Sequence, residues 1–180
     1  MKINTTRRGF VKGLAGAGAF SITGCKSVFG SQKIKLAVVG VMGKGFSDWT
    51  PMLKTGFVEI VAFCDCDRGK KDEAQKLLKK LNINFDMNSV PFYTDYRRLL
   101  DDAGVLGIEA MTISTTDHVH APVAIGAMKQ GIHVYVQKPL VRTLWELEYF
   151  GRTAKENGVI VQMGNQGSSL DAMRRCTEVI

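Results

Sequence analysis

The chain has 180 residues, of which 45% are hydrophobic, and a formal net charge of +7. Four of its 24 basic residues and none of its 17 acidic residues precede Cys25, so the remainder carries a net charge of only +3. This balance argues against a basic surface for nucleic acid, and no recognition helix is visible, so we expect no nucleic-acid partner.

The N-terminus has the pattern of an export leader. Arg7 and Arg8 are followed by Phe10, Lys12 and a Gly/Ala-rich apolar run over residues 14–22, which is too short to span a bilayer. We predict a twin-arginine signal peptide, which directs a folded protein to the periplasm. An accidental arginine pair in a weakly apolar terminus is the alternative.

The leader ends in a second signal. Ile22, Thr23, Gly24 and Cys25 resemble a bacterial lipobox, in which the cysteine is diacylated. A lipidated Cys25 would tether the domain to a membrane face without a spanning helix. Removal of this cysteine by a conventional signal peptidase is the alternative. In both cases residues 1–32 are assigned to the signal peptide and its linker.

Apolar runs and amphipathic segments alternate along the rest of the chain. Continuous apolar runs are typical of strands buried on both faces of a parallel sheet. The alternation predicts a Rossmann-type α/β fold, a doubly wound parallel sheet, over residues 33–164, with ligands at the carboxyl ends of its strands. Strands are predicted over residues 34–40, 58–65, 108–114, 133–139 and 159–164, and helices over residues 46–55, 70–81, 96–102, 121–128 and 144–156.

The first strand ends in the glycine-rich turn GVMGKG. The dinucleotide fingerprint has glycines at the positions of residues 40, 42 and 45, for a tight turn, close approach of the pyrophosphate and close helix packing. Gly40 and Gly45 match, Met42 replaces the second glycine, and Gly43 supplies room one residue later. We assign these four residues to a cofactor site, with a purely structural turn as the alternative.

An acidic residue follows at the distance that the fingerprint requires. Asp65 lies 20 residues after Gly45 and ends the second strand, where its carboxylate can accept hydrogen bonds from both adenosine ribose hydroxyls. A carboxylate there repels a 2′-phosphate, which favours NAD over NADP, although Arg68 and Lys70 nearby keep NADP open. Capping of the following helix is the structural alternative for Asp65.

The third and fourth strand ends carry a family resemblance. The segment TISTTDHVHAPVAIGAMKQGIHVYVQKPL, together with FYTDYRRLL and VQMGNQGSS, resembles the nucleotide-binding domain of the Gfo/Idh/MocA oxidoreductases, from about Ile34 to Gly167. The resemblance implies that Ser114, Thr115 and His118 line the nicotinamide ribose and pyrophosphate side of the cofactor.

The resemblance also assigns the end of the fourth strand. It implies that Lys138 is a catalytic residue that faces the nicotinamide and the substrate, where a lysine can bind a sugar hydroxyl and offset charge on its oxygen. Gln137 stands where the family most often has Glu, and we keep it in the cofactor site. The Lys138–Pro139 bond is a candidate for cis geometry. No metal site is expected, and a metal pair of His118 and His120 is the alternative.

The implied function is hydride transfer between NAD(P) and a sugar or cyclitol. An NAD-dependent glycosidase of the same family has the same motifs, and a truncated, non-catalytic dinucleotide-binding module is a third interpretation. The resemblance implies a C-terminal α+β domain that brings the catalytic acid/base and often mediates homo-oligomerisation, and we expect this domain to be absent from the 180 residues. Residues 165–180 are expected to begin it.

Overall fold

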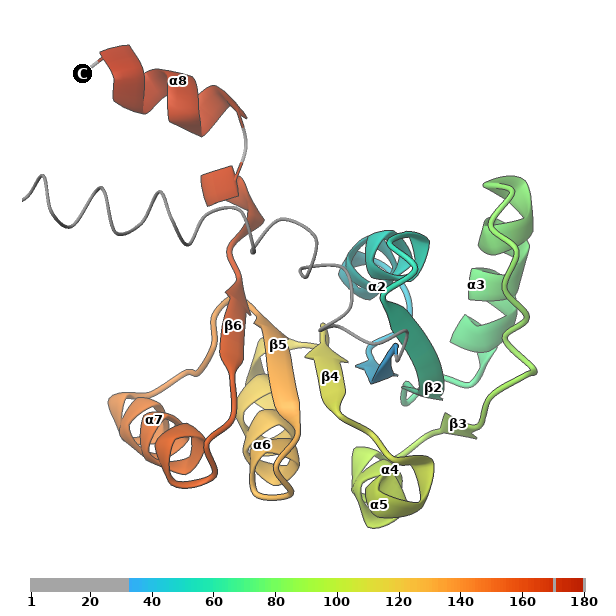
Figure 1. Cartoon of the computed structure of the whole chain (residues 1–180), viewed down its shortest axis with the longest axis horizontal. Coiled ribbons are helices and arrows are strands. Elements are labelled where there is room, and N and C mark those ends of the chain that lie inside the picture. The colour runs from blue at the N-terminus through green and yellow to red at the C-terminus, as the bar shows by residue number, and fades with distance from the viewer. Residues whose placement is uncertain (1–32, 170, 180) are drawn as a thin grey trace, which may run out of the picture. The chain divides into compact units, whose positions relative to one another are not determined.

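One parallel sheet organises the part of the chain that the structure describes. The structure is a computed structural model and describes residues 33–169 and 171–179, so the predicted leader and Cys25 lie outside the described residues. Within these residues the strand order is β3-β2-β1-β4-β5-β6, and every neighbouring pair is parallel (Figure 1). The strands are β1 (Ile34–Val39), β2 (Val58–Cys64), β3 (Phe92–Tyr93), β4 (Ala110–Ile113), β5 (His133–Gln137) and β6 (Val161–Gly164).

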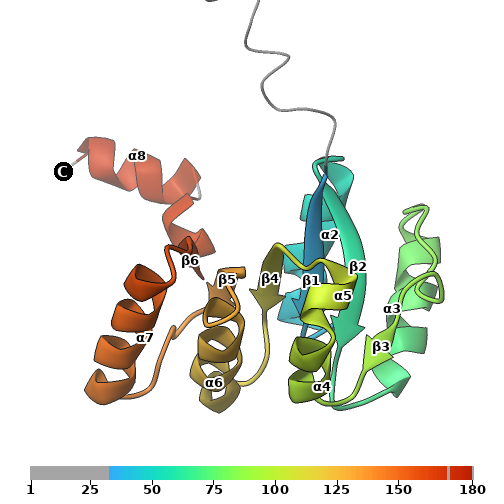
Figure 2. The same ribbon diagram turned by 60° about the horizontal axis from the view of Figure 1, so that its bottom comes forward.

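Helices cover both faces of this sheet, as Figures 1 and 2 show. On one face lie α2 (Lys44–Lys54) and α3 (Gly69–Lys80). On the other lie α4 (Tyr96–Asp101), α5 (Ala103–Leu106), α6 (Asp117–Met128) and α7 (Leu144–Glu156). The 3₁₀ helix η1 (Gln166–Ser169) and helix α8 (Asp171–Val179) follow the last strand. The predicted doubly wound Rossmann-type fold is therefore confirmed.

Each face of the sheet has its own hydrophobic core. Under α2 and α3 the core is aromatic: the Trp49 ring is fully buried and meets the rings of Phe46 and Phe63 edge-on, each with 5.2 Å between ring centroids. The Trp49 Nε1–H donates to the Val41 carbonyl over 3.0 Å, so helix α2 is fixed directly to the turn after β1. The opposite core joins α4, α5, α6 and α7 to the sheet through small and aliphatic side chains.

Element ends differ from the predicted ones for local reasons. Helix α2 begins at Lys44, two residues earlier than predicted, because Gly43 turns the chain with a φ of +60° directly before it. The predicted cap of α4 is confirmed, since the Asp95 carboxylate accepts from the Arg97 backbone N–H. Leu81, predicted on the apolar face of α3, is 50% exposed because the helix ends one residue before it.

The described residues include no helix that is both long and apolar enough to span a bilayer.

Candidate functional site

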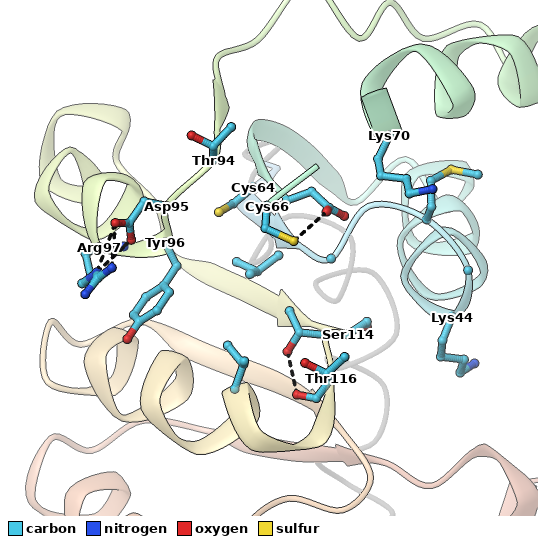
Figure 3. Close-up of a pocket in the computed structure, with 17 residues that line it drawn as sticks. Lys44, Cys64, Cys66, Lys70, Thr94, Asp95, Tyr96, Arg97, Ser114 and Thr116 are labelled. Atoms are coloured by element: carbon cyan, nitrogen blue, oxygen red, sulfur yellow. Dashed lines mark hydrogen bonds and ion pairs between the residues drawn. The ribbon is translucent and has the colours of Figure 1, made fainter. Parts of the chain in front are cut away.

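The carboxyl ends of β1, β2 and β4 border one cavity. The order of strands reverses between β1 and β4, because the chain leaves β1 toward β2 and leaves β4 toward β5, and ligands bind at such a point in open α/β sheets. The cavity has a volume of about 770 Å³, within the range of small-molecule sites (Figure 3). Its polar and glycine lining is Gly40, Gly43, Lys44, Asp65, Cys66, Lys70, Thr94, Asp95, Tyr96, Arg97, Ser114, Thr115 and Thr116, with Val39, Met42, Cys64 and Val119 as the apolar part.

The glycine-rich turn is closely packed at Gly40 and Gly45 and open at Gly43. A Cβ atom on Gly40, which has a φ of +87°, would overlap the Ser114 carbonyl, and one on Gly45 would overlap the Gly40 carbonyl. Gly43 has no atom within 4 Å of the position of a Cβ. Met42 lines the cavity but also packs partly against the aromatic core. The turn therefore leaves its backbone accessible at Gly43.

Asp65 ties the end of β2 to this turn. Its Oδ2 accepts the Val41 backbone N–H over 2.9 Å, and its Oδ1 accepts the Asp67 N–H over 3.1 Å. Asp65 does not take the alternative role as a helix cap. The N-cap of α3 is Arg68, without a side-chain cap hydrogen bond, and the Gly69 N–H at the start of α3 donates to the Asp67 carboxylate over 2.8 Å. A carboxylate has about four acceptor positions, so Asp65 keeps acceptor capacity toward the cavity that it lines.

The start of α4 forms one wall of the cavity, and its residues were not among the predicted site residues. Arg97 forms a two-point ion pair with Asp95, with 2.9 Å between Nη2 and Oδ2, and its hydrogen bonds lower the pKa of the Asp95 carboxyl (Figure 3). The FYTDYRRLL motif was the signal, but its spacing alone does not show that it faces the end of β2.

The two cysteines at the end of β2 lie in different environments. The Cys64 thiol is buried, and burial, with smaller contributions from Asp65 and Asp95, raises its pKa to about 12. Cys66 is exposed, lines the cavity, and its Sγ lies 3.8 Å from Asp65 Oδ1. Residues two apart in a strand share one face, but Cys66 lies beyond the end of β2 at Cys64, so it does not share the buried environment of Cys64.

A buried carboxylate on α2, which was not among the predicted site residues, joins three strand ends. Asp48 is 7% exposed, and its Oδ2 accepts from Ser114 Oγ and from Gln137 Nε2, each over 2.8 Å. Its Oδ1 lies 2.8 Å from Lys44 Nζ and accepts from Gln166 Nε2 over 3.3 Å. The signal was an acidic residue among the apolar residues of the first helix.

The histidines occupy different places. His118 is exposed at the start of α6 and does not line the cavity. His120 is 1% exposed, and its Nδ1 and Nε2 lie 2.7 Å and 3.1 Å from the carbonyl oxygens of Pro139 and Thr115. Both of its ring nitrogens are thus occupied by backbone, and the described residues include no group of three or more metal-ligating side chains. His120 instead links the loops that follow β4 and β5.

Three further residues assigned to the site lie outside the cavity lining. Gly45 is beneath the turn, Gln137 is 4% exposed and bonded to Asp48, and Lys138 is exposed at the carboxyl end of β5. The Lys138–Pro139 peptide is cis. Among the described residues, no hydrogen bond or ion pair engages the Lys138 ammonium group, which leaves it available at the edge of the sheet.

A family profile matches most of the described chain. The profile described as "Oxidoreductase family, NAD-binding Rossmann fold", of the Gfo/Idh/MocA group, matches residues 34–165. Among curated proteins, a glycosyl hydrolase family 109 protein of Akkermansia muciniphila is 28% identical over 75% of this chain and 28% of its own length. An inositol 2-dehydrogenase of Salmonella paratyphi B is 30% identical over 73% of this chain and 36% of its own length. The chain spans about a third of the length of such relatives.

Solved structures share the fold. GenD2 from gentamicin A biosynthesis, in complex with NAD, matches 82% of this chain and 39% of its own with a TM-score of 0.67 and 20% identity. Myo-inositol 2-dehydrogenase from Lactobacillus plantarum matches 82% of this chain and 41% of its own with a TM-score of 0.66 and 21% identity. At these identities the likeness establishes the fold.

Proposed function

Because the chain belongs to the Gfo/Idh/MocA oxidoreductase family and carries its NAD-binding Rossmann domain, we propose that it binds NAD in preference to NADP, for hydride transfer to or from a sugar or cyclitol carbon. The main observation in support of this proposal is the cavity beside the point where the strand order reverses, between β1 and β4. There Asp65 binds the glycine-rich turn through the Val41 N–H. NAD would supply the hydride acceptor, and the residues of this chain would bind and orient the cofactor and the substrate.

The residues present fit a dinucleotide. Gly43 leaves open space over the turn that precedes α2, and the backbone N–H groups at the start of a helix of 11 residues attract a pyrophosphate. Asp65 lines the same cavity and retains acceptor capacity for ribose hydroxyls. The turn would therefore hold the pyrophosphate and Asp65 the adenosine ribose.

The preference for NAD rests on the charges at the end of β2. The Asp65 carboxylate repels a 2′-phosphate. Lys70, which lines the cavity together with the cations Lys44 and Arg97, has its ammonium 3.0 Å from Glu73 and 3.8 Å from Asp67. Because these carboxylates already neutralise Lys70, it offers little attraction to an additional phosphate.

The substrate end is assigned to the carboxyl ends of β4 and β5. We propose that Ser114, Thr115 and His118 border the nicotinamide side and that Lys138, exposed at the strand end, binds the reacting hydroxyl group. A sugar or cyclitol is supported by the relatives, which include inositol 2-dehydrogenases and glycosyl hydrolase family 109 proteins. The latter favour transient sugar oxidation in a glycosidase as the second candidate function.

Isothermal titration of the purified chain with NAD and NADP tests the cofactor proposal. We expect NAD to bind at least about tenfold more tightly than NADP, since repulsion worth 1.4 kcal/mol gives a factor of ten. A thermal-shift titration provides an independent readout, because a ligand that binds only the folded state raises the melting temperature. Equal affinities would contradict the assigned role of Asp65, and binding of neither would overturn the proposed function.

We further propose that residues 165–180 begin a second domain that brings the catalytic acid/base.

We also propose that the protein is exported by the twin-arginine route, as a periplasmic or Cys25-lipidated protein. Replacing Arg7 and Arg8 together by Lys is expected to abolish export, because the charge is kept and only the guanidinium pair is lost. Cell fractionation followed by immunoblotting measures it, with Lys2→Gln as the control that removes a charge outside the pair. Unchanged export of the double variant would contradict the leader assignment.

A further inference from the structure

We propose that Asp48 is a positioning residue of the cofactor site, which fixes the carboxyl ends of β4 and β5 by binding the Ser114 hydroxyl and the Gln137 amide. This inference rests on the proposed function, because the ligand whose binding it serves is NAD. Asp48 itself does not line the cavity.

The contacts of Asp48 exceed what a helix needs for its own stability. A buried charge is costly unless it is hydrogen-bonded. Asp48 meets this requirement with donors from four places: Lys44 on its own helix, Ser114 after β4, Gln137 at the end of β5, and Gln166 after β6. One carboxylate thus connects segments that are 66, 89 and 118 residues away in sequence.

The two strand ends that it holds continue into the site. The Ser114 carbonyl lies against Gly40, close enough to exclude any Cβ there, and Thr115 lines the cavity. Gln137 directly precedes Lys138. A shift of either strand end would therefore move the floor of the glycine-rich turn or the lysine at the substrate end.

The hydrogen bond between Gln137 and Asp48 fixes one orientation of the Gln137 amide. A carboxylate only accepts hydrogen bonds, so the NH₂ group of Gln137 has to face Asp48. With an amide at both positions, either side chain can donate, and this constraint is lost. The remaining charged or titratable groups that face Asp48 are Lys44, at 2.8 Å, and Tyr135, whose pKa is raised mainly by burial and further by the Asp48 charge.

Three variants of the full chain test the inference: D48N, Q137E and the double variant D48N/Q137E. Q137E places two carboxylates in a contact that now spans 2.8 Å, and like charges at that distance raise the pKa of one of them. We expect Q137E to bind NAD at least about tenfold more weakly than the parent at pH 8 and to recover affinity as the pH is lowered, because protonation of one carboxyl ends the repulsion.

In D48N/Q137E the amide stands at position 48 and the carboxylate at position 137. The pair again contains one group that only accepts hydrogen bonds and one that can donate. We expect its NAD affinity to return to within about threefold of the parent at pH 8, whereas D48N alone stays weaker than the double variant. Gln130→Glu, which adds a charge at an exposed position of the same domain, is the matched control and should bind as the parent does.

Titration calorimetry with NAD, with melting temperatures measured in parallel, separates the outcomes. Recovery of NAD affinity in D48N/Q137E supports the inference, and it does so even if Q137E alone does not fold. A double variant that is as weak as Q137E, or a Q137E chain that binds as the parent does, overturns it while NAD binding by the parent stands. A parent chain that binds no NAD overturns the proposed function, and the inference with it.

Discussion

Gly45→Ala is expected to destabilise the domain by about 3 kcal/mol or more, the upper end of the cost of overpacking. The added Cβ would overlap the Gly40 carbonyl, which is backbone and belongs to the turn between β1 and α2. Neither partner can rotate away, because Gly40 itself packs against the Ser114 carbonyl and α2 is fixed through Trp49. A loss of this size is a large part of the stability of an ordinary domain.

Urea unfolding followed by circular dichroism measures this effect, with Gly151→Ala as the matched control. Gly151 lies inside α7 and has no atom within 4 Å of a new Cβ. Because alanine is the better helix former, this control should gain roughly 0.5–1 kcal/mol. The same chemical change is therefore predicted to have opposite signs at the two positions, and equal effects would contradict the close packing of the turn.

Asp65→Asn is expected to weaken NAD binding by about 10- to 100-fold, because hydrogen bonds to a charged acceptor are worth about 1.5–3 kcal/mol. Asp65 also accepts the N–H groups of Val41 and Asp67, one on each carboxylate oxygen, and asparagine is chosen over alanine because its single amide oxygen can still accept from one of them. Alanine would leave both without their present acceptor, at about 1–3 kcal/mol for each that is buried, and would confound binding with folding.

Calorimetry at a temperature where both proteins are fully folded provides the measurement. The control is Asp101→Asn, which removes the same charge from an exposed residue of α4. We expect the control to bind NAD as the parent does. An unchanged affinity of Asp65→Asn, with only its melting temperature lowered, would assign Asp65 to the structure of the turn alone.

Most of the sheet could be predicted because its strands are buried on both faces. β1, β2 and β5 are mostly apolar over five to seven residues, so each stands out as a short apolar segment of the length of a strand. β3 has two residues and α5 has four, too few for any hydrophobic period to appear. The order of the strands depends on which edges pair, and a single sequence carries no direct record of that pairing.

The site residues that follow a short sequence motif could be predicted. The residues that come together from distant segments could not. Gly40, Gly43 and Asp65 follow a local spacing, and the structure brings them to one cavity. Asp48 reaches Gln137 across 89 residues, and its partner became visible only when α2 and β5 were placed. The amide at position 137 then has a physical reason, since it donates to a carboxylate that is already there.

The position of β1 in the middle of the sheet sets an order of events during synthesis. β1 pairs with β2 on one side and with β4 on the other, and Val39 meets Ile113 only after 74 further residues have been made. Until then a nascent chain exposes one unpaired edge of its central strand, a state prone to misassociation. The cavity also lacks its Ser114 to Thr116 wall during that time. Cofactor capture is therefore expected to be a late step, after the synthesis of β4. If the proposed export in the folded state takes place, capture also has to precede passage across the membrane.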